Sequence, residues 1–415
     1  MPMIPLSTAY CLLPTAYCPV RELNKKMPID STDPVALAQA LIRCPSVTPA
    51  EGGALTFLES VLGPAGFTCH RLIMQEPGTP DVENLYARIG STSPHLCFAG
   101  HTDVVPVGDE KAWTRPPFGA VIESGVLYGR GAADMKGGIA CFAAAAIDYL
   151  NEVGGLNRGS ISFLITGDEE AIAINGTPKL LDWLKARSET IDACVVGEPA
   201  SLKAIGDEIK IGRRGYMNAE IVVAGKQGHA AYPQNADNPV PKLARIIDRI
   251  CAEPLDAGSG PFEPTSVQAT IISVPNTATN VIPASARVNF NIRYNDLHTP
   301  ASVEAWIRGH CETVAKELGA KFTITLSGTG DVFLTKPGPL VNKMADAVRT
   351  VTGTAPRFTT TGGTSDARFI KNFCPVVEAG LRNATVHQVD EHVPVDDLLK
   401  LTRIYRRFIA DYFAV

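Results

Sequence analysis

The sequence predicts an α/β protein that carries a second, α+β domain as an insertion. Three observations lead to this prediction. Apolar strand-like runs alternate with helical segments as far as residue 211, the segments between residues 216 and 326 follow the order β-α-β-β-α-β, and the α/β alternation resumes after Gly330. Alternating strands and helices favour a central, mostly parallel sheet flanked by helices, whereas the inserted order is that of a ferredoxin-like sandwich.

Length and composition are those of an ordinary globular protein. The chain has 415 residues, a net charge of −5 and 45% hydrophobic residues, and this length favours two or three domains. The charge gives no electrostatic case for binding nucleic acid or an anionic membrane. No apolar run approaches the roughly 18 residues of a membrane span. The ten cysteines form no CxxC pair, which is typical of a protein of the reducing cytoplasm.

The first 26 residues differ from the rest of the chain. They repeat a Thr-Ala-Tyr-Cys unit between prolines and show no helical or strand periodicity. Arg21, Lys25 and Lys26 follow the apolar residues, whereas the basic residues of a signal peptide precede them. We therefore expect residues 1–26 to be a disordered or non-native extension, with Met27 as a candidate start of translation.

The first α/β segment begins with Asp33-Pro34, which opens a helix over residues 34–41 in the favoured order of cap and proline. A glycine-rich loop over residues 129–138 leads into an alanine-rich helix. The predicted strands of this segment cover residues 95–100, 126–128, 161–166 and 192–196.

The inserted domain contains four predicted strands and two helices. The strands cover residues 216–223, 265–274, 286–294 and 321–326, and the helices cover residues 239–251 and 300–318. The α/β pattern then returns with a helix over residues 340–351, a strand over residues 375–379 and a closing helix over residues 395–413.

Three consecutive acids, Asp168, Glu169 and Glu170, follow the buried strand that ends near Thr166. Three like charges at the edge of a core cost energy unless a cation neutralises them, although a solvated turn could also carry them. His101 and Glu198 stand at the ends of other predicted strands. Ligands of open α/β sheets bind at the carboxyl ends of the strands, so these side chains are expected to meet there.

Asp134, in the glycine-rich loop, and His387, after the last strand, complete a set of two imidazoles and several carboxylates. Such a set suits a divalent metal of the zinc type, and a shared carboxylate can bridge two ions about 3.5–4 Å apart. Asp103 is placed to hold the second nitrogen of His101. Each residue has another reading: Asp134 as a helix N-cap, Glu198-Pro199 as a turn, and either histidine as a residue that binds no metal.

Written motifs strengthen this interpretation. The segments Gly100-His-Thr-Asp-Val-Val-Pro, Leu127-Tyr-Gly-Arg-Gly-Ala-Ala-Asp-Met-Lys-Gly and Thr166-Gly-Asp-Glu-Glu resemble the M20 family of two-zinc aminoacyl and peptide hydrolases. The resemblance extends from residue 27 to the C-terminus and includes the inserted domain. It implies a metal-binding catalytic domain over residues 27–213 and 329–415, and a dimerisation and lid domain over residues 214–328.

The resemblance also implies roles for particular residues. Two Zn²⁺ ions per subunit, with Co²⁺ able to substitute, would be held by His101, Asp134 as the bridge, Glu170, Glu198 and His387. The pKa of a water between the two ions would be much lower than that of bulk water. Glu169 matches the general base, and Asp103 matches a catalytic aspartate beside the ligands. His229 matches a residue that reaches into the site of a partner subunit, which implies a homodimer. The resemblance gives no role to Asp168 and leaves His392 as a rim or surface residue.

Four further segments, which begin at Ile174, Lys210, Gln227 and Thr361, resemble family members that act on a succinylated diamino acid. The implied reaction splits N-succinyl-LL-2,6-diaminopimelate into succinate and LL-2,6-diaminopimelate, on the route to lysine. Alternatives are hydrolysis of acetylornithine or of acylated amino acids, or a non-catalytic dimeric scaffold. The substrate has three carboxylates, which favours arginine partners. The matching substrate positions are Lys210, Arg213, Tyr232, Asn280, Arg293, Ser327, Gly363, Thr364 and Asn383.

Overall fold

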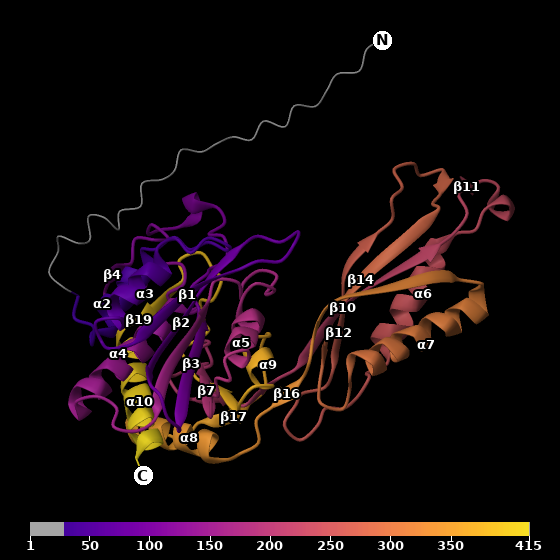
Figure 1. The fold of residues 1–415 in the computed structure, drawn as a ribbon. Coiled ribbons are helices and arrows are strands. Elements are labelled where there is room, and N and C mark those ends of the chain that lie inside the picture. The colour runs from indigo at the N-terminus through magenta and orange to yellow at the C-terminus, as the bar shows by residue number, and fades with distance from the viewer. Residues whose placement is uncertain (1–28, 415) are drawn as a thin grey trace.

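The structure, a computed structural model, describes residues 29–414. The predicted extension over residues 1–26 lies outside the described residues. Figure 1 shows a larger lobe built from both ends of the described chain and a smaller lobe built from its middle. Each lobe has its own hydrophobic core. No described helix combines the length and the apolar character that crossing a membrane requires.

The larger lobe is built on a sheet of eight strands. Strand pairs β3–β6, β3–β7, β7–β18 and β8–β17 are parallel, whereas β1–β2, β2–β6 and β8–β18 are antiparallel. The prediction of a central, mostly parallel sheet is therefore confirmed. In sheet order the strands are β1 (Thr68–Met74), β2 (Val82–Gly90), β6 (Ser160–Thr166), β3 (His95–His101), β7 (Ala193–Val196), β18 (Val376–Glu378), β8 (Glu208–Lys210) and β17 (Arg357–Thr359).

Helices cover both faces of this sheet. Alternate residues of the buried strands point to opposite faces, so that Phe98 joins one core cluster and Ala99 the other. The helices on the first face are α2 (Pro34–Ile42), α3 (Ala54–Leu62), α4 (Lys136–Val153), α8 (Pro339–Thr352) and α10 (Val395–Phe413). Helices α5 (Thr177–Lys185) and α9 (Ala367–Ile370) cover the second face. A small sheet of β4 (Val121–Glu123), β5 (Val126–Tyr128) and β19 (His392–Pro394) lies beside the first face.

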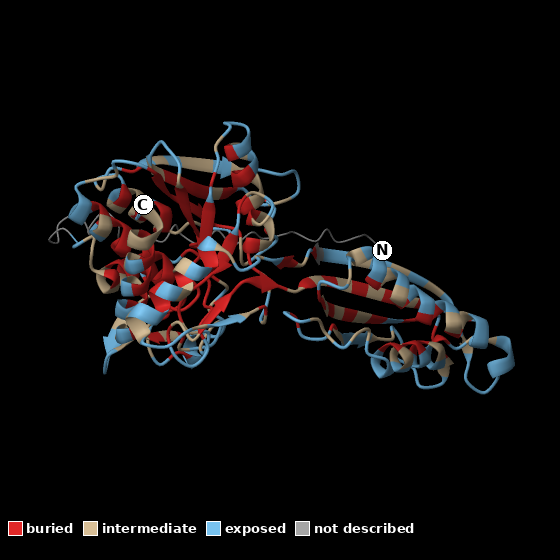
Figure 2. Cartoon of the chain, turned by 90° about the horizontal axis from the view of Figure 1, so that it is seen from below, coloured by how far each residue is buried: buried red, intermediate tan, exposed pale blue. Residues whose placement is uncertain are grey.

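The smaller lobe has the predicted β-α-β-β-α-β order. Its elements are β10 (Gly215–Ala224), α6 (Pro239–Ala252), β12 (Ser266–Ser273), β14 (Ser285–Tyr294), α7 (Pro300–Leu318) and β15 (Lys321–Gly330). The antiparallel sheet has the order β12-β14-β10-β15. Buried and less buried positions alternate along β10 and β14 because only one face of the sheet packs on the helices (Figure 2).

Local sequence explains where the longest helix of this lobe begins and ends. Thr299 and Ser302 form a reciprocal capping box at the start of α7, and Pro300 occupies its first position. Gly319 ends the helix in the left-handed conformation, with φ of 64°. These signals explain why the predicted bounds of this helix agree with the structure.

Two short strands join the lobes. Strand β9 (Gly212–Arg213) leads into the smaller lobe and pairs with β16 (Phe333–Leu334), which leads out of it. Strand β15 continues to Gly330, two residues past the predicted end of the inserted domain. At the far end of the smaller lobe, β11 (Gly228–His229) pairs with β13 (Val281–Ile282) (Figure 1). Short 3₁₀ turns lie at Glu110–Ala112 and Pro233–Asn235.

Candidate metal centre

Side chains from four neighbouring strand ends and one loop meet at one edge of the larger sheet. Strands β6, β3, β7 and β18 are neighbours and run parallel, so their carboxyl ends lie together. Glu170 follows β6, His101 ends β3, and Glu198 follows β7. His387 lies in the loop after β18, and Asp134 lies in the turn that leads into α4.

Asp134 lies between the two histidines. Its Oδ1 is 3.1 Å from Nε2 of His101, and its Oδ2 is 3.5 Å from Nε2 of His387. Glu198 Oε1 lies 3.5 Å from the same nitrogen of His101. Glu170 Oε1 lies 2.9 Å from Nε2 of His387. The arrangement is therefore two groups, each of one imidazole and one glutamate, that share the carboxylate of Asp134.

Glu169 lies in the same cluster. The potential ligand atoms of His101, Glu169 and Glu198 all lie within 4.8 Å of one another, and the same holds for His101, Asp134 and Glu170. Burial and then the charge of Glu198 raise the pKa of Glu169 well above its ordinary value. A carboxylate with a raised pKa beside the potential ligands is suited to accept and return a proton.

The charge balance of the cluster favours cations. Among the described residues, the ion pairs of Asp134, Glu170 and Glu198 are made only with the two histidines. Against the effect of burial, hydrogen bonds with the histidines lower the pKa of Asp134. Burial and the charge of Asp134 raise the pKa of Glu198 to about 7. Two imidazoles and this excess of carboxylates fit a pair of divalent ions of the zinc type.

Asp103 contacts the cluster differently from the prediction. Nδ1 of His101 donates to the backbone oxygen of Asp103 at 2.9 Å, and the nearer carboxylate oxygen is 3.6 Å away. The carboxylate instead accepts the backbone N–H groups of Glu169 at 3.3 Å and of Glu170 at 3.1 Å. Asp103 therefore fixes the acidic turn with its side chain and orients His101 with its backbone. Burial raises the pKa of Asp103 to about 6.

The acidic turn is not solvated throughout. Asp168 is buried, and its Oδ2 accepts the backbone N–H of Asn175 at 2.8 Å. Its own N–H donates to Thr166 Oγ1 at 3.1 Å. Asp168 thus closes the loop after β6, a structural role that the sequence did not reveal.

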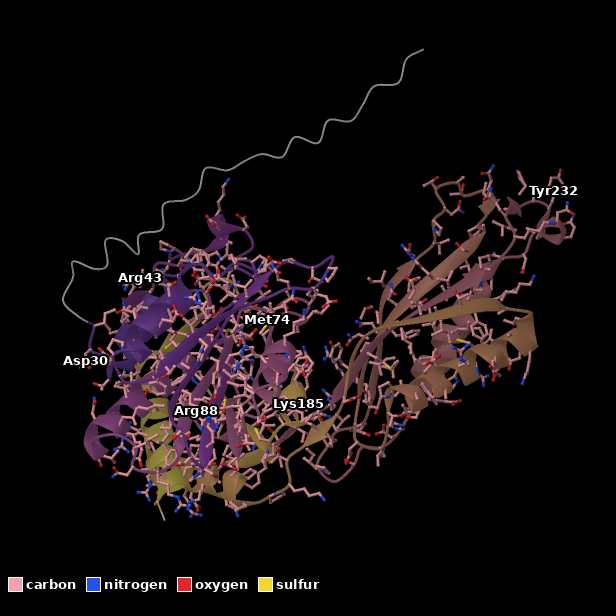
Figure 3. All side chains as sticks on the ribbon, viewed as in Figure 1. Asp30, Arg43, Met74, Arg88, Lys185 and Tyr232 are labelled. Carbon is pink, nitrogen blue, oxygen red and sulfur yellow. The ribbon has the colours of Figure 1, made fainter. Side chains whose placement is uncertain are left out.

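His229, Tyr232 and Asn280 lie apart from the cluster of their own chain. They occupy the far end of the smaller lobe, where Figure 3 labels Tyr232. The rings of His229 and Tyr232 are 5.7 Å apart, and the backbone oxygen of Asn280 accepts from Ala230 at 2.8 Å. All three predicted residues are exposed. Any role of theirs at a metal centre thus requires a second subunit or a large movement of the lobe.

Two predicted cationic substrate residues, Lys210 at the end of β8 and Arg213 on β9, are buried. Arg213 forms a bidentate ion pair with Glu378, and its Nη1 donates to the backbone oxygen of Gly363 at 3.1 Å. Nζ of Lys210 lies 3.2 Å from Thr361 Oγ1. In this conformation the guanidinium of Arg213 is paired with Glu378 in the protein interior. Its binding of a substrate carboxylate therefore stays a prediction.

The other predicted substrate residues are spread over both lobes. Arg293 on β14 lies over the ring of Tyr216 at 5.4 Å. Ser327 pairs across the sheet with Asn218. Thr364 accepts a hydrogen bond from Arg368 at 2.9 Å, and exposed Asn383 donates its N–H to Ser201 at 3.1 Å. These placements leave the predicted substrate roles open to experiment.

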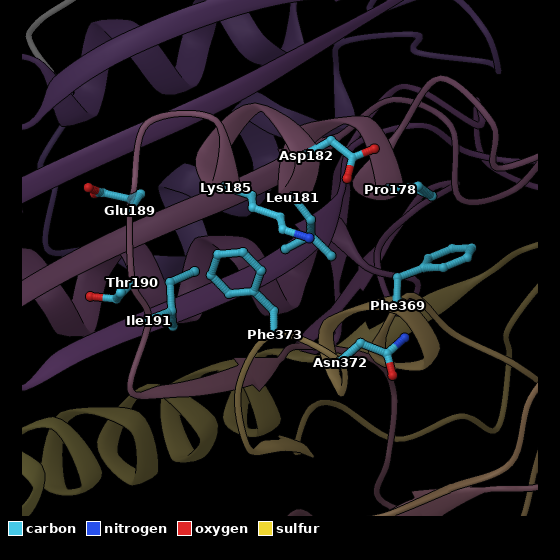
Figure 4. A pocket seen from close by; sticks show the side chains of 10 residues that line it. All are labelled: Pro178, Leu181, Asp182, Lys185, Glu189, Thr190, Ile191, Phe369, Asn372 and Phe373. Atoms are coloured by element: carbon cyan, nitrogen blue, oxygen red, sulfur yellow. The ribbon is translucent and has the colours of Figure 1, made fainter.

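A separate hollow of about 500 Å³ lies between α5 and α9 (Figure 4). Leu181, Ile191, Phe369 and Phe373 form its apolar wall, and the charged residues Lys185 and Glu189 also line it. None of the clustered histidines and carboxylates lines it. The hollow is therefore distinct from the candidate metal centre.

Comparison with known proteins identifies the family. Residues 97–411 match the model of peptidase family M20/M25/M40. The chain belongs to this family. A succinyl-diaminopimelate desuccinylase of Bradyrhizobium sp. (strain ORS 278) is 54% identical over 386 residues, which cover 92% of this chain and 100% of that relative. One of Rhodospirillum centenum is 56% identical over 382 residues, which cover 92% and 98%.

Solved M20 structures share the fold at low sequence identity. An M20 family metallo-carboxypeptidase of Sulfolobus solfataricus superposes with a TM-score of 0.72 at 20% identity and covers 92% of this chain and 99% of that one. A dinuclear metal binding peptidase of the M20 family from Bacillus subtilis gives 0.67 at 16% identity, with coverage of 91% and 97%. The two-lobed architecture is thus that of M20 enzymes, and the predicted fold class is confirmed.

Glu391 is one of several buried acids in this M20 chain that could not be recognised as buried from the sequence. It follows Asp390 in a loop, where a pair of acids is typical of a solvated turn, yet its side chain is completely buried. The only signal in the sequence is its position four residues after His387.

Metal uptake by this M20 chain is expected to release protons. Hydrogen bonds with Asp134 and Glu170 raise the pKa of His387 to about 10 in the metal-free protein, from an ordinary 6.5. Against the effect of burial, the neighbouring carboxylates of Asp134 and Glu198 also raise the pKa of His101. Because a metal ligand must be a neutral imidazole, the two histidines alone should release about two protons per chain on binding near pH 7, and affinity should fall as the pH falls.

Titration calorimetry in two buffers of different protonation enthalpy measures this release. Uptake of two ions without proton release would contradict the candidate ligands.

The raised pKa of His387 also affects folding. Since the folded pKa of His387 is raised, its charge stabilises the metal-free fold fully below about pH 6.5, and this contribution disappears as the pH rises through about 10.

Proposed function

We propose that this chain hydrolyses N-succinyl-LL-2,6-diaminopimelate to succinate and LL-2,6-diaminopimelate, a step toward lysine and meso-diaminopimelate. The observation that carries the proposal is the identity of 53–56% to relatives named succinyl-diaminopimelate desuccinylase, over at least 91% of this chain and 98–100% of theirs. The cluster at the sheet edge supplies the residue types that amide hydrolysis needs. The proposed enzyme works in the cytoplasm on a small-molecule substrate.

The metal ligands in this proposal are His101, Asp134, Glu170, Glu198 and His387. Two Zn²⁺ ions bound there, or Co²⁺ in their place, would polarise the succinyl carbonyl and lower the pKa of the attacking water. Asp134, with one oxygen toward each histidine, is suited to the bridging position. The imidazole and carboxylate donors support the choice of zinc as the natural metal, with cobalt able to substitute.

Glu169 acts as the general base in this proposal. It accepts a proton from water as the water oxygen bonds to the succinyl carbonyl carbon. It returns this proton to the leaving amine nitrogen as the C–N bond breaks. The second proton of the water also passes to the amine, so the products are a carboxylate and an ammonium group. Asp103 holds the backbone of Glu169 and Glu170, which fixes the base beside the ligand.

A homodimer supplies the remaining donor in this proposal. His229 is exposed at the far end of the smaller lobe, which is consistent with action in the site of a partner subunit. Strand β12 is an edge of the smaller sheet, and its Ile271 and Ile272 are 55% and 62% exposed. An uncovered edge strand with apolar side chains is suited to pairing with a second copy. The partner's histidine would stabilise negative charge on the carbonyl oxygen.

An assay of two substrates tests the proposed reaction. Purified zinc-loaded protein is given N-succinyl-LL-2,6-diaminopimelate and N-acetylornithine in parallel. We expect kcat/KM to be at least about 100-fold higher for the succinyl compound, because a site that pairs with the succinyl carboxylate discriminates against an acetyl group that lacks it. A preference for acetylornithine would overturn the substrate. No turnover of either compound by folded, metal-loaded protein would favour a non-catalytic scaffold.

A further inference from the structure

Glu391 joins the two loops that carry Asp134 and His387. Its side chain is completely buried, four residues after His387 and outside the set of candidate ligands. Its backbone oxygen accepts the N–H of Gly129 at 2.8 Å. The loop after β18 is thereby attached to the start of the glycine-rich loop.

The carboxylate of Glu391 accepts hydrogen bonds along the rest of that loop. Its Oε2 accepts from the N–H of Gly131 at 3.1 Å, and its Oε1 accepts from Ala133 at 2.9 Å and Asp134 at 3.1 Å. Three backbone N–H groups that converge on one anion form a rigid concave binding site for it. The position of the Asp134 backbone is therefore set directly by the side chain of Glu391.

Arg130 completes the connection between the loops. Its Nη1 donates to Glu391 Oε2 at 2.8 Å and to the backbone oxygen of Gln388 at 3.3 Å. Both Arg130 and Glu391 are almost fully buried. A buried ion pair holds its geometry strongly, because removal of one partner leaves an uncompensated charge.

Local backbone geometry makes this contact possible. Gly131 has φ of +86°, a conformation that glycine adopts without strain, and a Cβ atom there would lie 2.9 Å from Val104 and Lys136. The carboxylate also lies at the end of the loop that leads into the N-terminus of α4, where the helix dipole favours negative charge.

We propose that Glu391 is a positioning residue that sets the distance between Asp134 and His387 and so determines binding of the second metal ion. This inference rests on the proposed two-metal site. The ion held by His101, Asp134 and Glu198 depends on the Glu391 contacts only through Asp134. The ion held by His387, Asp134 and Glu170 takes ligands from both connected loops, so it is the one that a shift between the loops weakens.

Glu391→Gln tests the inference at nearly constant side-chain volume. The amide keeps one acceptor oxygen, but its NH₂ group faces backbone N–H donors. The uncharged side chain also no longer neutralises Arg130. Metal-free protein is titrated with Co²⁺, followed by calorimetry and by visible absorption, which reports coordination geometry. We expect the first ion to bind with unchanged affinity and the second about 10- to 100-fold more weakly, the usual loss when a residue that orients a ligand is changed.

Asp390→Asn is the matched control. Asp390 is the neighbouring acid, and its carboxylate accepts hydrogen bonds from the N–H and the hydroxyl of Thr114, both at 2.8 Å. Its φ of 56° is one that asparagine also adopts. This variant should bind both ions like the wild type. Equal affinity of wild type and Glu391→Gln for both ions, within about twofold, would overturn the inference.

A second variant keeps the inference testable if Glu391→Gln does not fold. If Glu391→Gln lacks the circular dichroism of the wild type, Glu391→Asp replaces it, since it keeps the charge beside Arg130 but is one methylene too short to reach every N–H group. The same selective loss is expected, and wild-type binding of both ions would overturn the inference. Wild-type protein that binds two ions without hydrolysing the succinyl substrate would contradict the proposed reaction alone.

Discussion

Replacement of Glu169 by glutamine is expected to lower kcat by roughly 10²- to 10⁴-fold while both metal ions stay bound, because it removes the proposed acceptor for the proton of water. Glu170 contacts His387 and Glu198 contacts His101, so neither candidate metal group needs Glu169 as a ligand. Glutamine keeps the shape of the side chain but cannot take up a proton. Steady-state kinetics together with metal analysis of the same sample measures both effects.

The adjacent residue provides the control for this variant. Glu170→Gln should lose affinity for the ion beside His387, since Glu170 Oε1 lies 2.9 Å from Nε2 of that histidine. The two neighbouring substitutions therefore separate loss of proton transfer from loss of metal. Turnover by Glu169→Gln at the wild-type rate would remove Glu169 from the mechanism.

His229→Ala is expected to abolish most of the activity without altering metal content. His229 lies at the far end of the smaller lobe, away from the candidate ligands of its own chain. If it acts in the partner's site, its loss removes a donor to the developing negative charge, which costs about 10²- to 10³-fold in kcat. Kinetics and metal analysis of the purified variant test this expectation.

Mixing two inactive variants tests action between subunits. In a mixed dimer of His229→Ala and Glu169→Gln chains, one site combines an intact Glu169 with an intact His229 from the partner. Random exchange of subunits should therefore restore about one quarter of the wild-type activity. Absence of recovery, with mixed dimers demonstrated by mass spectrometry, would exclude action of His229 across the dimer. Full activity of the His229→Ala variant on its own would exclude this histidine from catalysis.

The strand ends that carry the candidate site could be predicted from the sequence. Strands β3, β6 and β7 are buried along their whole length, so they occur as short apolar runs that stop at polar residues. His101, Glu170 and Glu198 stand directly at those stops. Once parallel strands were expected, their meeting at one edge followed from geometry alone.

Other features depend on contacts between distant parts of the chain. Strand β1 is an edge strand of mostly half-buried and exposed residues, and it lacks the apolar run that marks β3. The carboxylate of Asp103 binds backbone groups 66 and 67 residues away. Glu391 binds backbone groups 257–260 residues away. Neither hydrogen-bonding pattern has a local signature, so a buried carboxylate is indistinguishable in sequence from a surface acid.

The narrow connection between the lobes gives the smaller lobe mechanical leverage. Two residue pairs join β9 to β16. Hydrogen bonds from Thr360 to Pro261 and from Lys371 to Val332 add to this joint, as does Arg368, which lies over the ring of Tyr216 at 5.8 Å. Strand β10 extends from the joint for 10 residues, and a strand of that length spans about 33 Å. A rotation of about 10° at the joint would thus carry the outer end of such a strand through about 6 Å. A small rotation at the joint would therefore be amplified into a displacement of several ångströms at the outer end of the lobe, where His229 lies.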